Sequence, residues 1–328
     1  MKSVLHIGIN AVGIYSSRGM EIGFKKAGFT DYDFLDYQSI RFNEGTNGLL
    51  QRMLVKANIC KPELIFIHIQ NNDILDVETI KSLSKIGFTV LYNFDCRNKD
   101  ESKWMYDLAP YFGLVLFSNQ EDVDNCKELG IKNISVLQSS ADFDFYNKTG
   151  IDISKYPDVV FVGNNYVGTN LSFDLAKERQ EIIDFLYLEF DNKFESYGRG
   201  QSGQMIDPYE ESVCYNSAKI AISQSNFDKE FYTSDRIWKI MACGTFCLAR
   251  YFDGIEKIFE RGVHLDWFNG LDELKEKVEY YLENEDEREA IAKVGMNLVR
   301  ENHSWANRFE EMELLINKTL SNAKQVEV

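Results

Sequence analysis

The sequence predicts an α/β protein made of two doubly wound units of similar size. Short apolar runs rich in β-branched and aromatic residues alternate with longer amphipathic stretches, a pattern typical of parallel strands joined by crossover helices. This alternation stops over residues 142–157 and then restarts. At roughly 150 residues per domain, a chain of 328 residues has room for two domains.

The first half predicts one complete doubly wound unit. Its strands are expected at residues 4–9, 32–36, 64–69, 89–94, 114–117 and 135–137. The helices between them fit residues 17–27, 49–58, 77–86, 103–111 and 121–129. Gly28, Gly87 and Gly130 follow three of these helices, where a glycine readily takes the left-handed conformation that ends a helix.

The second half repeats the pattern after a polar segment that contains Gly150 and Pro157. We therefore expect domains at residues 1–155 and 156–328. Strands are expected within 158–164 and at 194–197, 220–223, 245–249 and 264–267, with helices at 173–190, 209–216, 234–243 and 255–260. The tail from residue 271 to about 320 has a helical pattern. Ligands of such sheets bind beyond the carboxyl ends of the strands, so we expect a site in loops after strands, in a cleft between the domains.

Charge argues against a polyanionic partner. The chain has 36 basic and 52 acidic residues, a net charge of −16, which disfavours generic attraction to nucleic acid or anionic lipid. Residues 1–155 carry a net −3 and residues 156–328 a net −13. The second half therefore needs local means to bind an anion, whereas the first half leaves even an anionic partner open.

The lack of a recognisable targeting signal and the pattern of cysteines lead us to expect a cytoplasmic protein. No apolar run approaches the roughly 18 residues of a membrane span, and the start lacks the pattern of a signal peptide, so we expect no integral membrane association. The 6 cysteines contain no CxxC pair and are interpreted as buried thiols in a reducing compartment.

Two short loops after strands are candidate anion sites. Residues 161–165 run from a hydrophobic strand into Gly163 and Asn164, where the backbone could approach a phosphate closely. Residues 196–200 place Arg199 between two glycines, where its guanidinium could bind a phosphate. A plain strand-ending turn is the structural alternative for the first loop, and an exposed surface arginine is the alternative for the second.

Residues 233–244 are the most informative stretch. Ser234 is a good N-cap, followed by Asp235 and by an apolar stripe with helical spacing. Arg236 and Lys239 share the opposite face near the helix start. Free amide groups, the positive end of the helix dipole and two cations then converge on one point, which suits a diphosphate. A capped helix with a solvated basic face is the structural alternative.

Asp95 is the candidate general base. It follows a strongly β-like strand at the expected carboxyl edge of the first sheet, where a carboxylate could accept a proton from a hydroxyl. A turn-forming role is the alternative. His6 and His68 lie in apolar strands and are interpreted as core histidines, and the 4 histidines show no metal-ligand spacing. We expect no metal.

The ordered segments FVGNN, SYGRG, KIAISQSN, SDRIWKIMACGTFCL and HSWANRFEEM, with the stretch from residue 254 to 284, resemble the carboxyl-terminal half of the CgeB-like glycosyltransferases. These belong to the GT-B enzymes, related to the group 1 glycosyl transferases. The resemblance covers residues 158–315 well and the first half more loosely, through PELIFIHIQ, TVLYNFDCRN, APYFGLVLFSN and LGIKNISVLQSSAD. It implies two Rossmann-like domains facing across a cleft, with a long helical carboxyl-terminal tail.

The resemblance also implies roles for the candidate residues. Gly163 and Asn164 would approach the donor phosphates or sugar, while Arg199 and the catalytic Arg236 would neutralise the departing diphosphate. The set of donor-binding residues is completed by Ser223, Gln224, Ser234, Asp235 and Lys239. Lys239 departs from the pattern, since many relatives have a glutamate there that binds the ribose hydroxyls, and a cation cannot accept those hydrogen bonds.

The expected function is metal-independent transfer of a sugar from a nucleotide-diphosphate sugar, with a UDP-sugar as the favoured donor, to a hydroxyl-bearing acceptor. The nucleotide-sugar is a co-substrate, so no cofactor is expected. A glycan, a protein, a small molecule and a modified nucleic-acid base are all compatible as acceptors. Retention of the anomeric configuration is expected only by analogy. The alternatives are a non-catalytic nucleotide-sugar or glycan-binding module of GT-B shape and a nucleotide-sugar epimerase.

Overall fold

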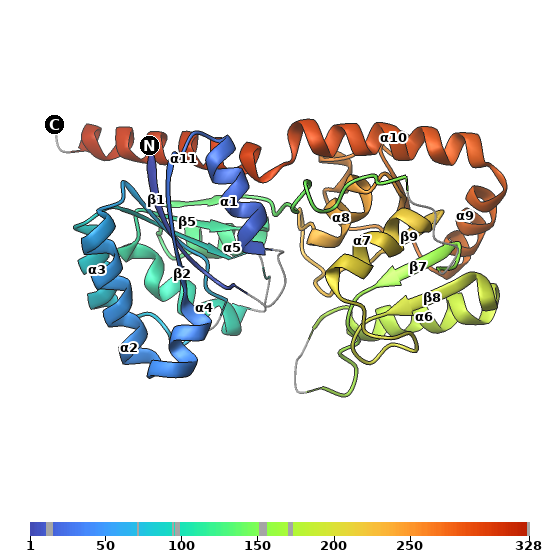
Figure 1. Cartoon of the computed structure of the whole chain (residues 1–328), viewed down its shortest axis with the longest axis horizontal. Helices are drawn as coiled ribbons and strands as arrows, with labels where there is room; N and C mark the ends of the chain where they lie inside the picture. Colours follow the sequence, from blue (N-terminus) through green and yellow to red (C-terminus); the bar gives the residue numbers. More distant parts are fainter. Residues whose placement is uncertain are drawn as a thin grey trace. The chain divides into compact units, whose positions relative to one another are not determined.

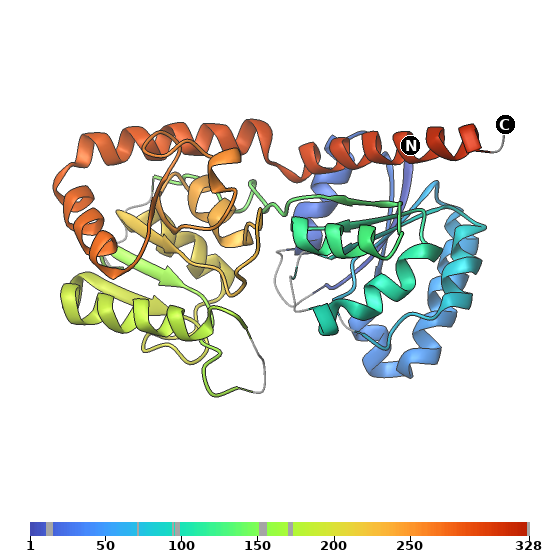
Figure 2. The same ribbon diagram turned by 180° about the vertical axis from the view of Figure 1, so that it is seen from behind.

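The computed structural model describes residues 1–10, 16–70, 72–93, 95, 99–150, 156–169 and 173–326. They form two compact units, one of Met1–Ser139 with Trp305–Val328 and the other of Ser140–Ser304. Each unit contains one parallel sheet with helices on both faces (Figures 1 and 2). The predicted fold class is confirmed.

The first unit has a sheet of six parallel strands in the order β2-β1-β3-β4-β5-β6. The strands are β1 (Ser3–Gly8), β2 (Asp31–Asp36), β3 (Leu64–Ile67), β4 (Phe88–Asn93), β5 (Leu114–Phe117) and β6 (Ile134–Val136). The helices are α1 (Ser16–Lys26), α2 (Tyr37–Cys60), α3 (Val77–Ser84), α4 (Lys99–Leu108), the 3-10 turn η1 (Ala109–Tyr111), α5 (Gln120–Glu128) and α11 (Trp305–Val326). Every strand expected in this half is present.

Two local details of this unit differ from expectation. Helix α2 starts at Tyr37 instead of residue 49, because the Asp36 side chain caps it by accepting from Gln38 N at 3.1 Å, and a kink at Gly45 (φ 73°) interrupts it. Gly28 and Gly130 have the positive φ of a helix-ending glycine. Gly87 serves another purpose, since a Cβ there would lie 2.4 Å from Pro62 O.

Different helices cover the two faces of the first sheet. Side chains of α2, α3, α4 and α5 form the core on one face. On the other face, α1 packs with α11, which returns from the end of the chain (Figure 1). The rings of Phe24 and Phe309 stack with centroids 3.6 Å apart, and a Cβ on Gly23 would lie 2.4 Å from Trp305 Cβ. Helix α11 therefore completes this core.

The second unit has a sheet of five parallel strands in the order β11-β10-β9-β7-β8. The strands are β7 (Val159–Val162), β8 (Phe194–Tyr197), β9 (Ile220–Ser223), β10 (Phe246–Arg250) and β11 (Asp266–Phe268). The helices are α6 (Ala176–Phe190), α7 (Pro208–Ser217), α8 (Asp235–Ala242), α9 (Leu271–Glu283) and α10 (Glu285–Asn302), with 3-10 turns η2 (Asp191–Lys193) and η3 (Ile255–Lys257). The helix expected at 255–260 is thus the short turn η3.

The units divide at a different place from the expected boundary after residue 155. The first unit ends at Ser139, because Phe143 and Tyr146 already pack into the core of the second unit. The tail is shared, because α9 and α10 pack in the second unit whereas α11 packs in the first. A contiguous division of the sequence could not reveal this return.

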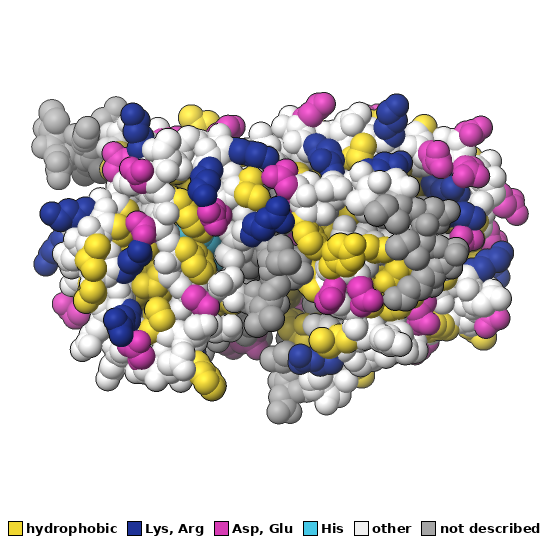
Figure 3. Space-filling view, viewed as in Figure 1, with side chains coloured by type: hydrophobic (Ala, Val, Ile, Leu, Met, Phe, Trp, Pro, Cys, Tyr) yellow, Lys and Arg dark blue, Asp and Glu magenta, His cyan; other side chains and the backbone are white. Residues whose placement is uncertain are grey.

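Thiols and helix composition add two observations. Cys126, Cys243 and Cys247 are buried free thiols, Cys60 is a half-buried one, and the Cys214 side chain is also buried. Within the described ranges, no helix combines the length and the apolar character that a membrane span requires. On the face drawn in Figure 3, basic and acidic side chains are interspersed.

Candidate functional site

The carboxyl ends of β7 and β9 form the switch point of the second sheet. Strand β7 lies between β8 and β9, so the chain leaves β7 in one direction and β9 in the other. The pairing of β7 with β9 covers only Val159–Ile220 and Val160–Ala221, whereas its pairing with β8 continues to Val162. Beyond Val160 the two strands separate. Sheets of this kind bind ligands at such a point.

The loops after β7 and β8 are held together by their backbones. Gly163 N donates to Tyr197 O at 2.8 Å, and Asn165 N donates to Arg199 O at 2.9 Å. The Asn164 side chain accepts from Arg199 N at 3.0 Å. The structure thus brings together two predicted donor-binding residues, Asn164 and Arg199. Arg199 is exposed, so its guanidinium can meet a ligand.

Arg236 reaches from the first turn of α8 into the gap between β7 and β9. Its Nε donates to Val162 O at 2.6 Å, and its Nη1 donates to Gln224 O at 2.8 Å. Its Nη2 lies 2.5 Å from the position that a Cβ on Gly163 would take. The N-cap Ser234 accepts from Arg236 N at 3.2 Å, as the sequence predicts. Arg236 therefore joins the separated strands and leaves one nitrogen beside Gly163.

Arg179 on α6 is the residue that sequence reasoning missed. Its side chain is 2% exposed. Nη1 donates to Asn164 O at 2.9 Å, Nη2 to Gln224 O at 2.8 Å and Nε to Gln224 Oε1 at 2.7 Å. The signal available in the sequence was an arginine followed by Ile182, Ile183 and Leu186, which places it on the buried side of the helix.

The two guanidiniums create a concentrated positive charge. Their Cζ atoms lie 5.3 Å (Arg179) and 5.0 Å (Arg236) from the centroid of the Phe161 ring. Among the described residues, no carboxylate forms an ion pair with either one, and their hydrogen bonds go to neutral oxygens. Burial and the nearby Arg236 lower the pKa of Arg179. Such an arrangement attracts an anion.

Lys239 belongs to a different cluster. Its Nζ lies 2.8 Å from Asp235 Oδ2 and 3.5 Å from Glu211 Oε2, and Tyr146 OH donates to Glu211 Oε2 at 2.6 Å. Burial alone would lower the pKa of Lys239, but these two carboxylates more than offset it, so the pKa is raised. The charge of Lys239 is thus neutralised within the protein, and so is that of Asp235.

Ser223 and Gln224 lie where the sequence places them, at the end of β9. Ser223 lines a small cavity of about 20 Å³, together with Ser234 and aromatic side chains of the loops that follow β9 and β10. Gln224 is 1% exposed and engaged by both arginines. Gln224 accepts hydrogen bonds from Arg179 and Arg236, so it contributes to the site by holding these two side chains.

Asp95 lies in the first unit, just after β4, and its backbone N donates to Asn93 Oδ1 at 3.0 Å. Arg97, its neighbour in the motif, is outside the described residues. His6 is buried among aromatic rings and its Nδ1 lies 2.9 Å from Tyr32 OH. Burial lowers the pKa of His6, so it remains neutral, as a core histidine does.

The described part of the chain contains no group of three or more His, Cys, Asp or Glu side chains arranged to hold a metal ion.

A family described as glycosyl transferase-like matches residues 177–313, a segment that begins in α6 and ends in α11. It contains Arg179, Gln224 and Arg236. No curated protein sequence matches the chain.

Solved structures match over almost the whole chain. A glycosyltransferase from Rickettsia africae is 12% identical, with a TM-score of 0.60, and the match covers 98% of this chain and 99% of that one. Anabaena HepE in complex with UDP-glucose is 13% identical, with a TM-score of 0.64 and coverage of 97% and 99%. Sucrose-phosphate synthase from Thermosynechococcus elongatus is 9% identical, with a TM-score of 0.63 and coverage of 98% and 100%. Residues 177–313 therefore match a glycosyl transferase-like family, and the chain has the GT-B fold of glycosyltransferases.

Proposed function

We propose that the protein is a member of the CgeB-like group, a glycosyltransferase that moves a sugar from a UDP-sugar to a hydroxyl-bearing acceptor. The observation that carries this proposal is the pair of guanidiniums at the switch point of the second sheet, beside the capped start of α8, neither of which forms an ion pair with a carboxylate of the described residues. The family match over this unit and the UDP-glucose in the HepE structure support the same reading.

The chemistry follows from where charge develops. As the bond between the anomeric carbon and the diphosphate breaks, negative charge grows on the leaving phosphate oxygens. Arg236 Nη2, the Arg199 guanidinium and the positive end of the α8 dipole would stabilise it. The acceptor hydroxyl would lose its proton to the Asp95 carboxylate.

A panel of nucleotide sugars, incubated with the full chain, tests the proposal. We expect slow hydrolysis of a UDP-sugar, because water replaces the missing acceptor, and faster UDP release once a suitable acceptor is added. Binding without turnover would instead identify a non-catalytic module, and interconversion of the sugars an epimerase.

Arg236→Ala should weaken UDP binding, and unchanged binding would refute the diphosphate placement. Asp95→Asn should retain donor binding and lose transfer to the acceptor.

The same assay tests metal independence. We expect turnover to be unaffected by excess EDTA, because the guanidiniums and the α8 dipole would take the part that a divalent cation plays in metal-dependent transferases. Loss of turnover with EDTA, and its return with added Mg²⁺ or Mn²⁺, would contradict this expectation.

A further inference from the structure

The ends of β7 and β9 are joined by side chains where the ladder of hydrogen bonds stops. After Val160 the strands no longer pair, and Val162 O and Gln224 O turn to guanidinium groups. Arg236 spans the two strands from one side. Arg179 approaches from α6 and donates to Asn164 O and Gln224 O.

The shape of the Arg179 side chain suits this task. A guanidinium presents its donors in one rigid plane, and here all three nitrogens donate, with distances between 2.7 and 2.9 Å. A lysine ammonium in the same place is a single point of charge and cannot reach three oxygens that lie in different directions. The fork therefore fixes the distance between Asn164 and Gln224.

Burial separates the role of Arg179 from that of Arg236. With 2% of its side chain exposed and each of its three nitrogens hydrogen-bonded to the protein, Arg179 is shielded from direct contact with a ligand. Its acceptor Gln224 O is also an acceptor of Arg236 Nη1. A displacement of Gln224 would therefore move Arg236, and a displacement of Asn164 would move the loop that carries Arg199.

We propose that Arg179 is a positioning residue of the nucleotide site, which holds Asn164, Gln224 and, through Gln224, Arg236 in the geometry that binds a diphosphate. This inference rests on the proposed function, since it assigns Arg179 a role toward the same ligand. Misplacement of binding groups by about 1 Å can reduce activity by two orders of magnitude.

The test measures UDP binding by calorimetry and melting temperature for the full chain and its Arg179→Lys and Arg179→Gln variants. Both variants should raise the Kd for UDP about tenfold or more, and the KM for the UDP-sugar with it, because both lose the fork. Arg179→Lys keeps the positive charge, so restoration of wild-type affinity by lysine would show that charge, not position, is what matters, and would overturn the proposal.

Arg288→Gln is the matched control. Arg288 is 3% exposed, lies in the same unit and donates to Tyr281 O at 2.6 Å, away from the switch point. Its loss should lower the melting temperature, as should the loss of Arg179, and leave the Kd for UDP unchanged. A purely structural Arg179 would behave in the same way as Arg288, with lower stability and unaltered UDP affinity, and that result would also overturn the proposal.

Two further readouts keep the outcome clear. If neither Arg179 variant folds, Gln224→Met removes one of the three hydrogen bonds and should weaken UDP binding by about threefold or more, since charge-assisted bonds are the stronger ones. Unchanged affinity in that variant counts against the proposal. If the wild-type chain itself binds neither UDP nor any nucleotide sugar, the proposed function fails; if it binds UDP and the Arg179 variants bind equally well, only the positioning role fails.

Discussion

Gly198 allows the loops after β7 and β8 to touch. Its φ of 137° lies in a region that other residues avoid, and a Cβ there would lie 2.4 Å from Gly163 O. The contact it permits sets the hydrogen bonds that bring Arg199 beside Asn164.

Gly198→Ala should therefore disturb the site as well as the fold. We expect a loss of more than about 2 kcal/mol of stability, since backbone strain and a steric clash add, together with weaker UDP binding. Thermal unfolding and calorimetry measure the two effects. Gly130→Ala is the control: Gly130 has a φ of 77° and open space around it, so it should cost only about 1 kcal/mol and leave UDP binding intact. Equal losses in both variants would show that the approach to Gly163 is unimportant.

Predictability at this scale depends on how far a residue's partners lie along the chain. Ser234 and Arg236 could be chosen from the sequence because an N-cap and a helix face are local features. Arg179 could not, because its acceptors are 15 and 45 residues away and meet it only through the sheet. The pairing of Lys239 with Glu211, 28 residues away on α7, was hidden for the same reason.

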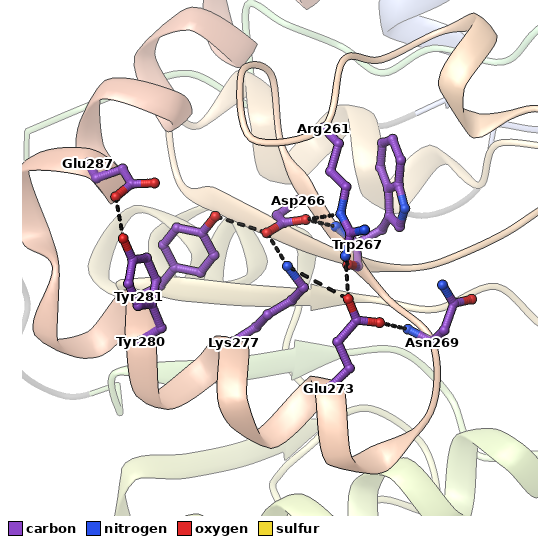
Figure 4. A network of polar contacts seen from close by, with 9 residues as sticks. All are labelled: Arg261, Asp266, Trp267, Asn269, Glu273, Lys277, Tyr280, Tyr281 and Glu287. Atoms are coloured by element: carbon purple, nitrogen blue, oxygen red, sulfur yellow. Dashed lines mark hydrogen bonds and ion pairs between the residues drawn. The ribbon is translucent and has the colours of Figure 1, made fainter.

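At the scale of elements, the edge strand β11 is tied to α9 by one buried carboxylate (Figure 4). Asp266 accepts from Arg261 Nε at 2.9 Å, from Tyr281 OH at 2.9 Å and from its neighbour Trp267 N at 2.7 Å. Lys277 Nζ also donates to it. Burial alone would raise the pKa of Asp266. The hydrogen bonds from Lys277, Arg261 and Tyr281 lower it by more, so the pKa lies below its ordinary value.

Asp266→Asn should destabilise the second unit in a pH-dependent way. The ionised carboxylate favours the folded state, so its contribution is complete above the unfolded-state pKa of about 4 and is lost as pH falls through the lower folded-state pKa. We expect a cost of about 3 kcal/mol near neutral pH, because two cations lose their buried partner, and a smaller difference from wild type at pH of about 3.

Melting curves of wild type and Asp266→Asn near neutral pH and at a pH of about 3 measure the difference in stability. Glu276→Gln is the control, because Glu276 is an exposed residue on α9. A gap between Asp266→Asn and wild type that does not change with pH would contradict the assignment.

The positions of the strands were the most predictable feature at this scale, because buried parallel strands appear in the sequence as apolar runs. Strands β8 and β9 have the bounds expected from the sequence. The first half of α2 was missed because its residues from Gln38 to Gly48 show no apolar stripe, and two glycines interrupt it.

At the scale of the molecule, the chain path makes the first unit depend on its last helix. Trp305, Phe309, Met312 and Ile316 of α11 are all buried in the same core as α1. At about 1.5–3 kcal/mol for each buried side chain, they supply an amount comparable to the whole stability of a domain, about 5–15 kcal/mol. The two units carry the same net charges as the two halves divided after residue 155, because Met1–Ser139 with Trp305–Val328 carries −3 and Ser140–Ser304 carries −13.

A chain that ends after Ser304 should keep the second unit folded and lose the first. We expect calorimetry to show one unfolding transition, and hydrogen exchange to show unprotected amides in β1 to β6, because one face of that sheet is then covered by α1 alone. A chain that ends after Asn322 is the control, since it retains the four buried side chains of α11 and should behave as the full chain. Normal protection of the first sheet without α11 would refute this dependence.

The return of α11 also sets the order of events during synthesis. A ribosome completes the first 139 residues early, yet the unit they belong to lacks its covering helix until residues 305 to 316 have emerged. At roughly 5–20 residues per second, the intervening 165 residues take on the order of ten to thirty seconds. During that interval one apolar face of the first sheet is covered by α1 alone, while the later segment can already fold. The part of the protein that is made first therefore becomes native last.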